Sequence, residues 1–263
     1  MSSPAAIWRR IWRTPLLVLH LLAGIMVAAL LRPGRDGAVS CMPLMLWSRV
    51  LCRVLGVHIR VTGTPHAGAT LFVANHISWL DIFCIAAVCP THFLAKREVA
   101  GWPLVGWLSR RAGTAFIRRG GDNGAGEAAE QLTWRLRNRG RVLVFPEGTS
   151  TDGRSVRRFF ARLFQAALLA RCPVQAIALR YPDASGTGLH ARVPFIDDAA
   201  LLPHLWALLG ERRIVVELQF CPPLAVAGRS RNELAGQARA QISAVLAGKP
   251  GGEWSVARLQ DSR

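Results

Sequence analysis

The hydrophobic pattern divides the chain of 263 residues into an apolar N-terminal part and a longer part of short alternating runs. Residues 14–31 contain one histidine and no charged side chain. A run of this length is at the lower limit for spanning about 30 Å of hydrocarbon. Arginines flank it on both sides, and Trp8 and Trp12 suit the interface between lipid and water. The pattern predicts a helix that spans the membrane or lies in one leaflet, and the flanking charges leave its orientation open.

A second apolar stretch covers residues 42–57 and carries Arg49 and Arg53 one helical turn apart. This spacing predicts an amphipathic helix, suited to the membrane surface or to packing on a folded domain. We therefore expect a membrane-associated helical segment over residues 1–57.

From residue 58 onward, short apolar runs alternate with stretches of helical periodicity. The expected strands are His58–Thr62, Thr70–Ala74, His92–Ala95, Thr114–Arg118, Val142–Phe145, Val174–Arg180 and Ile214–Phe220. The expected helices lie near residues 79–89, 103–111, 124–138, 156–171, 200–209 and 231–247. This alternation predicts an α/β domain over residues 58–248, with a mixed, largely parallel sheet flanked by helices. We expect a loop at Gly120–Gly126 and a flexible tail at residues 249–263.

Charge and cysteine content narrow the class of protein. The net charge of +17 attracts phosphate groups, on nucleic acid or on anionic lipid, although a compositional bias towards arginine would give the same charge. A nucleic-acid-binding protein is disfavoured because we find no helix-turn-helix, zinc or aromatic-strand motif. The six cysteines show no Cys-x-x-Cys pair and no zinc-ligand spacing. We expect reduced core cysteines and no metal site.

The first candidate for chemistry is His76, which follows an apolar strand and has Asp81 five positions later. Positions five apart do not face each other on an ideal helix. The two side chains can therefore meet only if His76 stands in the turn before the helix, with Ser78 as its N-cap. A carboxylate on one imidazole nitrogen would leave the other nitrogen free to take a proton. Ser78 and Asp81 also fit a capping box without any chemical role.

The second candidate is Glu147-Gly148-Thr149, which follows the expected strand Val142–Phe145 and Pro146. Ligands of α/β sheets bind at the carboxyl ends of the strands. The alternative is an ordinary strand-ending turn with glycine at positive φ.

Four blocks follow one another along the chain: the His76–Asp81 spacing, Gly113–Arg119, Phe145–Thr149 and Val174–Leu179. In this order they resemble the 1-acyl-sn-glycerol-3-phosphate acyltransferase family of bacterial lysophospholipid acyltransferases. The resemblance covers roughly residues 55–225.

The resemblance implies that His76 removes the proton of an acceptor hydroxyl and that Asp81 holds the imidazole. The hydroxyl would attack the thioester of acyl-CoA or acyl carrier protein, and no other cofactor and no metal is needed. The residues expected to position the polar head of the acceptor are Lys96, Arg119, Glu147, Gly148 and Thr149.

Two departures from the family pattern concern the acceptor. Ser150 stands where the family often has an arginine, and Arg118 stands where it has an aspartate. Losing a bidentate donor weakens the case for a phosphate-bearing acceptor. Candidates to replace it lie downstream at Arg154, Arg157 and Arg158. The stretch from Glu147 to Gly153 also resembles the branch that acylates lyso-ornithine lipid.

The expected function is acyl transfer to a lysolipid, in the first place 1-acyl-sn-glycerol-3-phosphate giving phosphatidic acid. The alternatives are a lyso-ornithine lipid O-acyltransferase and a non-catalytic basic membrane or nucleic-acid-binding protein. The expected partners are a lysolipid, an acyl thioester and an anionic membrane surface, without nucleic acid. The expected location is the cytoplasmic face of a bacterial inner membrane.

Overall fold

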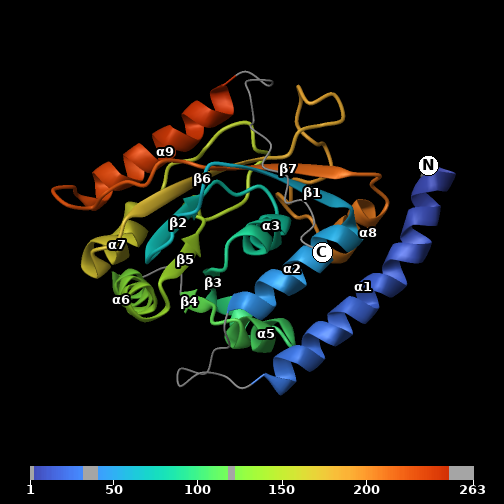
Figure 1. Ribbon diagram of the computed structural model, residues 1–263, viewed down its shortest axis with the longest axis horizontal. Helices are drawn as coiled ribbons and strands as arrows, with labels where there is room; N and C mark the ends of the chain where they lie inside the picture. Colours follow the sequence, from blue (N-terminus) through green and yellow to red (C-terminus); the bar gives the residue numbers. More distant parts are fainter. Residues whose placement is uncertain (1–2, 32–40, 118–121, 249–263) are drawn as a thin grey trace.

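The computed structural model describes residues 3–31, 41–117 and 122–248, so the tail at 249–263 lies outside the described residues. These residues form one seven-stranded sheet with helices on both faces (Figure 1). The strands are β1 (Val57–Thr62), β2 (Thr70–Ala74), β3 (His92–Lys96), β4 (Ala115–Ile117), β5 (Arg141–Val144), β6 (Val174–Arg180) and β7 (Ile214–Phe220). The helices are α1 (Pro4–Leu30), α2 (Cys41–Leu55), α3 (Leu80–Val88), α4 (Arg97–Ala100), α5 (Val105–Arg111), α6 (Asp122–Arg139), the 3₁₀ helix η1 (Ala161–Phe164), α7 (Gln165–Ala170), α8 (Leu201–Leu209) and α9 (Arg231–Ala247).

The strand order is β1-β7-β6-β2-β5-β3-β4. Strands β6, β2, β5, β3 and β4 pair in parallel, whereas β7 is antiparallel to β6 and parallel to β1. The prediction of a mixed, largely parallel sheet is confirmed. The carboxyl ends of β2, β5 and β6 therefore meet at one edge of the sheet.

Burial on both faces explains why the central strands are apolar throughout. Every residue of β2 is buried. Phe72 and Ala74 pack into a core with α2, α3 and α8, whereas Leu71 and Val73 pack into a second core with α6, α7 and α9. Alternate side chains of a strand point to opposite faces, so a strand covered on both sides has no polar face.

Two expected boundaries were wrong. Residues 156–160 are not helical, because backbone donors of this segment bind elsewhere: Phe160 N–H donates to Pro146 O at 2.9 Å. The expected loop at Gly120–Gly126 is helical from Asp122 onward, and Gly120 and Gly121 lie outside the described residues. Each glycine costs a helix about 1 kcal/mol relative to alanine. We attribute the continued helix to extension from the part of α6 that packs on the core.

Helix α1 begins ten residues before the apolar run, at Pro4, with Ser3 Oγ accepting from Ala6 N–H. Among the described residues it is the one helix long and apolar enough to cross a membrane, a criterion that signal sequences and core helices also meet. Many of its large apolar side chains are exposed.

The arginines that precede the apolar run bind backbone carbonyl groups of the α/β domain. Arg10 and Arg13 are buried. Arg10 Nε donates to Trp206 O at 2.9 Å, and Arg13 Nη1 donates to Glu211 O at 2.7 Å and to Leu209 O at 3.2 Å. Cations at the C-terminus of a helix bind its free carbonyl groups and its dipole. The first half of α1 is thus attached to the end of α8.

Helix α2 packs on the domain, which was one of its two expected places. Its core-facing residues join the cluster around α3. Arg49 Nε donates to Ala87 O near the end of α3 at 2.7 Å, whereas Arg53 is exposed.

Candidate active site

The side chain of Asn75 fixes the chain where β2 ends. Its Nδ2 donates to Leu179 O of β6 at 2.9 Å, and its Oδ1 accepts from Leu179 N–H at 2.8 Å. These bonds continue the β2–β6 pairing by one residue through a side chain. His76 therefore leaves the sheet at its carboxyl edge, in the turn that precedes α3.

His76 and Asp81 are in direct contact, as the sequence predicted. His76 Nδ1 lies 2.9 Å from Asp81 Oδ2. The imidazole stacks on Phe145 with ring centroids 4.1 Å apart. The His76 side chain is 20% exposed and that of Asp81 is fully buried. Because Oδ2 accepts the proton of Nδ1, Nε2 is the nitrogen left to take a proton from a substrate.

The Asp81 carboxylate also binds the turn that carries His76. Its Oδ2 accepts from Ile77 N–H at 2.7 Å and from Ser78 N–H at 2.9 Å, and its Oδ1 accepts from Tyr181 Oη at 2.8 Å. Such bonds offset much of the cost of burying a charge.

Ser78 is not the N-cap that the sequence predicted. The cap position of α3 is Trp79, whose side chain makes no capping bond. Ser78 Oγ is buried and makes no hydrogen bond to any described residue. The Asp81 carboxylate accepts from Ser78 N–H, but the Ser78 hydroxyl does not bind a backbone N–H of α3. One of the two hydrogen bonds of a capping box is therefore present, and the same carboxylate orients the imidazole.

Glu147 links the His76 turn to a later segment. Its Oε1 accepts from His76 N–H at 2.9 Å and its Oε2 accepts from Arg157 N–H at 2.8 Å. The side chain is buried, which raises the pKa of the carboxyl, and the two backbone N–H groups oppose that rise. Gly148 follows at φ +74°, the positive φ that the sequence suggested, and Thr149 is exposed.

Two further segments hold the same turn. Thr151 N–H donates to His76 O at 2.8 Å, and Phe195 N–H donates to Ile77 O at 2.9 Å. Ser150 Oγ donates to Phe195 O. Gly153 has φ +81°, and a Cβ there would lie 2.8 Å from Ile77 Cδ1. The close approach and the positive φ both favour glycine at this position.

The remaining expected site residues divide into two groups. The side chain of Lys96 and all of Arg119 lie outside the described residues. The downstream arginines Arg154, Arg157 and Arg158 are exposed, and Arg154 pairs with the exposed Asp152 at 3.5 Å.

Sequence reasoning missed Tyr181. It is the single tyrosine of the chain and directly follows β6, whose carboxyl end lies beside that of β2. A lone polar aromatic residue at the edge that carries His76 was the available signal.

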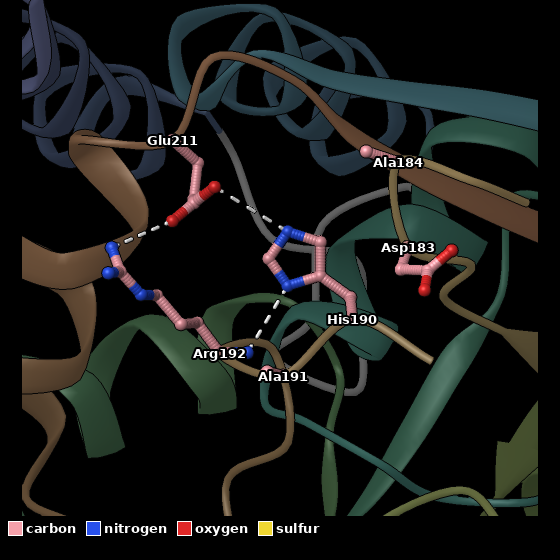
Figure 2. Close-up of a pocket in the computed structure, with 6 residues that line it drawn as sticks. All are labelled: Asp183, Ala184, His190, Ala191, Arg192 and Glu211. Atoms are coloured by element: carbon pink, nitrogen blue, oxygen red, sulfur yellow. Dashed lines mark hydrogen bonds and ion pairs between the residues drawn. The ribbon is translucent and has the colours of Figure 1, made fainter. Parts of the chain in front are cut away.

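Two surface cavities do not include His76. One of about 340 Å³ is lined by Asp183, Ala184, His190, Ala191, Arg192 and Glu211. In it, Glu211 pairs with Arg192 at 3.0 Å and with His190 at 3.7 Å (Figure 2). The other, of about 500 Å³, includes Gly68, His92 and Arg141, at the amino ends of the strands. The turn that carries His76 therefore lies at the opposite edge of the sheet from the second cavity.

A partly exposed imidazole, oriented by a buried carboxylate at the carboxyl edge of an α/β sheet, is an arrangement that can act as a general base. The comparisons with known proteins specify the class. Residues 58–180 match the family model described as Acyltransferase.

Three similar proteins extend this match. The lyso-ornithine lipid O-acyltransferase of Pseudomonas aeruginosa is 42% identical over 77% of this chain and 77% of its own length. The 1-acyl-sn-glycerol-3-phosphate acyltransferase of Neisseria gonorrhoeae is 33% identical over 73% of this chain and 75% of its own length. The crystal structure of the 1-acyl-sn-glycerophosphate acyltransferase PlsC from Thermotoga maritima has the same fold, with a TM-score of 0.62 and 19% identity, over 92% of this chain and 96% of that one.

The chain therefore belongs to the 1-acyl-sn-glycerol-3-phosphate acyltransferase family of lysophospholipid acyltransferases, and it is an O-acyltransferase.

Proposed function

We propose that the enzyme moves a fatty acyl group from acyl-CoA or acyl carrier protein to the free hydroxyl of a lysolipid. The observation that carries this proposal is the contact of 2.9 Å between His76 Nδ1 and Asp81 Oδ2, which leaves Nε2 as the proton acceptor. The first acceptor we propose is 1-acyl-sn-glycerol-3-phosphate, which would become phosphatidic acid.

The proposed reaction needs only groups that the site holds. His76 Nε2 takes the proton of the acceptor hydroxyl while its oxygen attacks the thioester carbonyl. The C–S bond then breaks, and the leaving thiolate takes the proton from the imidazolium. Asp81 keeps Nδ1 protonated and stabilises the imidazolium charge. Because a thiolate leaves readily, base catalysis and placement of the two substrates suffice.

We place the charged head of the acceptor beside the segment that Glu147 holds. Arg157 N–H binds Glu147, and the positive charge of Arg157 acts on that carboxyl. Exposed guanidinium groups at 154, 157 and 158 would supply donors for a phosphate. In this arrangement Glu147 positions the arginines and the base through the backbone, while Gly148 and Thr149 border the acceptor.

A lyso-ornithine lipid is the second candidate acceptor, because Ser150 replaces the arginine expected for phosphate. The Ser150 hydroxyl donates to Phe195 O, so the Ser150 side chain points to the neighbouring loop. The 42% identical relative from P. aeruginosa is named for this lipid.

We also propose that the enzyme works at the cytoplasmic face of a bacterial inner membrane. The exposed apolar side chains of α1 would contact lipid, and the net charge of +17 favours an anionic surface. Deleting residues 1–35 would lower membrane association. That deletion also removes Arg10 and Arg13 from α8, so point variants give a cleaner test.

His76→Ala tests the base. We expect turnover to fall by about 10²-fold or more, since a positioned general base typically contributes that much. Thiol release from acyl-CoA measures it, with lysophosphatidate, other lysophospholipids and lyso-ornithine lipid as separate acceptors. His58→Ala, at an exposed histidine of β1, is the matched control and should keep full activity. Near-normal turnover by the folded His76→Ala enzyme contradicts the base assignment.

The acceptor panel tests the head-group assignment together with Arg157→Ala. A phosphate-bearing acceptor predicts the highest wild-type turnover with lysophosphatidate and a higher KM for it in the variant. Preference for lyso-ornithine lipid would favour the second candidate, and no turnover with any lysolipid would contradict the function.

A further inference from the structure

Tyr181 makes a contact that the proposed reaction does not yet use. Its hydroxyl lies 2.8 Å from Asp81 Oδ1, and both side chains are almost fully buried. The other three donors to this carboxylate, His76 Nδ1 and two backbone N–H groups, all bind Oδ2. Among the described residues, Tyr181 is the one that donates a hydrogen bond to Oδ1.

We propose that Tyr181 is a positioning residue for acyl transfer, which holds the Asp81 carboxylate from β6 so that its other oxygen keeps His76 in the catalytic orientation. This inference rests on the proposed role of His76 as the base.

Geometry supports this role because Tyr181 belongs to a different element from the groups it acts on. His76, Ile77 and Ser78 belong to one turn, and their three donors all bind Oδ2, so none of them binds Oδ1. Tyr181 directly follows β6, which pairs with β2 and is held to it again by Asn75. A donor from β6 therefore ties the carboxylate to the sheet.

The surroundings of Tyr181 keep its hydroxyl a donor. Burial and the nearby Asp81 charge raise the pKa of the phenol well above its ordinary value. Cys84 Sγ lies 3.7 Å from Tyr181 Oη, one turn after Asp81 on α3, and burial also raises the pKa of this thiol. A phenol has one proton to donate. Because that proton goes to Asp81, the phenol can meet the Cys84 thiol only as an acceptor. The thiol can therefore contact the phenol oxygen without competing with Asp81 for the phenol proton.

A double-mutant cycle tests the proposal, with kcat and acceptor KM measured for wild type, Tyr181→Phe, Asp81→Asn and the double variant. We expect Tyr181→Phe to lower kcat about tenfold with little change in acceptor KM, as for loss of one bond to a charged group. In the Asp81→Asn enzyme the same change should cost less than about twofold, because the two residues act as a unit. Equal losses in both backgrounds, or no loss in either, would overturn the proposal.

A spectroscopic measurement keeps the test decisive if a variant is unstable. Because the chain has a single tyrosine, ¹³C-labelled tyrosine gives one Cζ resonance, which reports the phenol of Tyr181 alone. We expect that resonance to shift in Asp81→Asn and to stay in place in Glu98→Gln, at an exposed residue of α4. An unchanged resonance in Asp81→Asn would show that the phenol does not bind the carboxylate. Loss of turnover in His76→Ala, measured separately, distinguishes failure of this inference from failure of the proposed function.

Discussion

At the scale of single residues, two buried carboxylates hold His76 from different directions. Asp81 binds the imidazole of His76 and two N–H groups of its turn. Glu147 binds the backbone of His76 and that of Arg157. A carboxylate can accept several hydrogen bonds at once and carries no donor. Each acid therefore joins segments that a neutral side chain would join less well.

Glu147→Gln tests this account. The amide oxygen can accept one of the two N–H groups, but the amide NH₂ then faces the other N–H, donor against donor. We expect a loss of about 1–3 kcal/mol in the free energy of unfolding, as for an unsatisfied buried group. Urea denaturation measures the stability, and thiol release should show lower turnover.

Glu98→Gln is the matched control, since it makes the same change at an exposed position on α4. If Glu147→Gln retained wild-type stability and turnover, the linking role of the carboxylate would be wrong.

The site could be predicted from sequence only as far as its local part. The contact between His76 and Asp81 followed from a strand, a turn and a helix in succession, and the structure has it at 2.9 Å. Tyr181 is 100 residues from Asp81, and no local pattern encodes which distant side chain will fill a buried acceptor. Ser78 was assigned the wrong role because its spacing to Asp81 fits a capping box whichever group makes the bond.

At the scale of elements, the arginines of α1 show that a charge pattern typical of a membrane anchor can instead attach a helix to the folded domain. Arg9, Arg10 and Arg13 precede an apolar run, which resembles the flank of a membrane anchor. Arg9 Nε donates to Gly210 O at 2.8 Å, and the other two bind carbonyls nearby. Their charges complement the C-terminus of α8, so they attach α1 to the domain.

Arg13→Ala should lower the free energy of unfolding by about 2–3 kcal/mol, because it removes a buried charged donor from several carbonyl groups. Arg53→Ala, at an exposed arginine of α2, should change it little. Thermal and urea denaturation of both variants in detergent measure the difference. Equal stability of the two variants would mean that the contacts to α8 do not hold α1.

Element boundaries were predicted well where the hydrophobic pattern was strong. The bounds of β2, β6 and β7 agree with the sequence. The helix expected over 156–171 failed in its first five residues, because Arg157 N–H binds Glu147 and Phe160 N–H binds Pro146 O. The periodicity of a sequence indicates which side chains are apolar. It does not indicate that acceptors elsewhere in the fold will bind the backbone N–H groups of the segment.

At the scale of the whole molecule, exposed apolar side chains gather on the helix that the domain leaves uncovered. Helix α1 runs along the outside of the molecule, on the opposite side from α9 (Figure 1). Its Leu19 and Leu22 are 64% and 58% exposed, whereas Leu17 of the same helix is buried. Apolar groups exposed along one helix favour a lipid partner.

The double variant Leu19→Glu, Leu22→Glu should lose much of its binding to vesicles that contain anionic lipid, because each glutamate resists transfer into the apolar layer. Sedimentation with vesicles measures this at low and high salt, and the wild type should remain bound in both. The matched control is Asn232→Glu, Gln237→Glu, which adds the same charge on exposed positions of α9. Equal binding of the two double variants would contradict a lipid-facing α1.

The sequence by itself determined the alternation of strands and helices, the meeting of His76 with Asp81, and the family, because each of these depends on neighbours along the chain or on ordered local blocks. Only the tertiary structure decided that Tyr181 binds Asp81, that Glu147 holds Arg157, and that Arg10 and Arg13 bind α8. Buried polar groups must find hydrogen-bond partners wherever the packed chain brings them. Packing, which joins residues far apart in sequence, selects those partners.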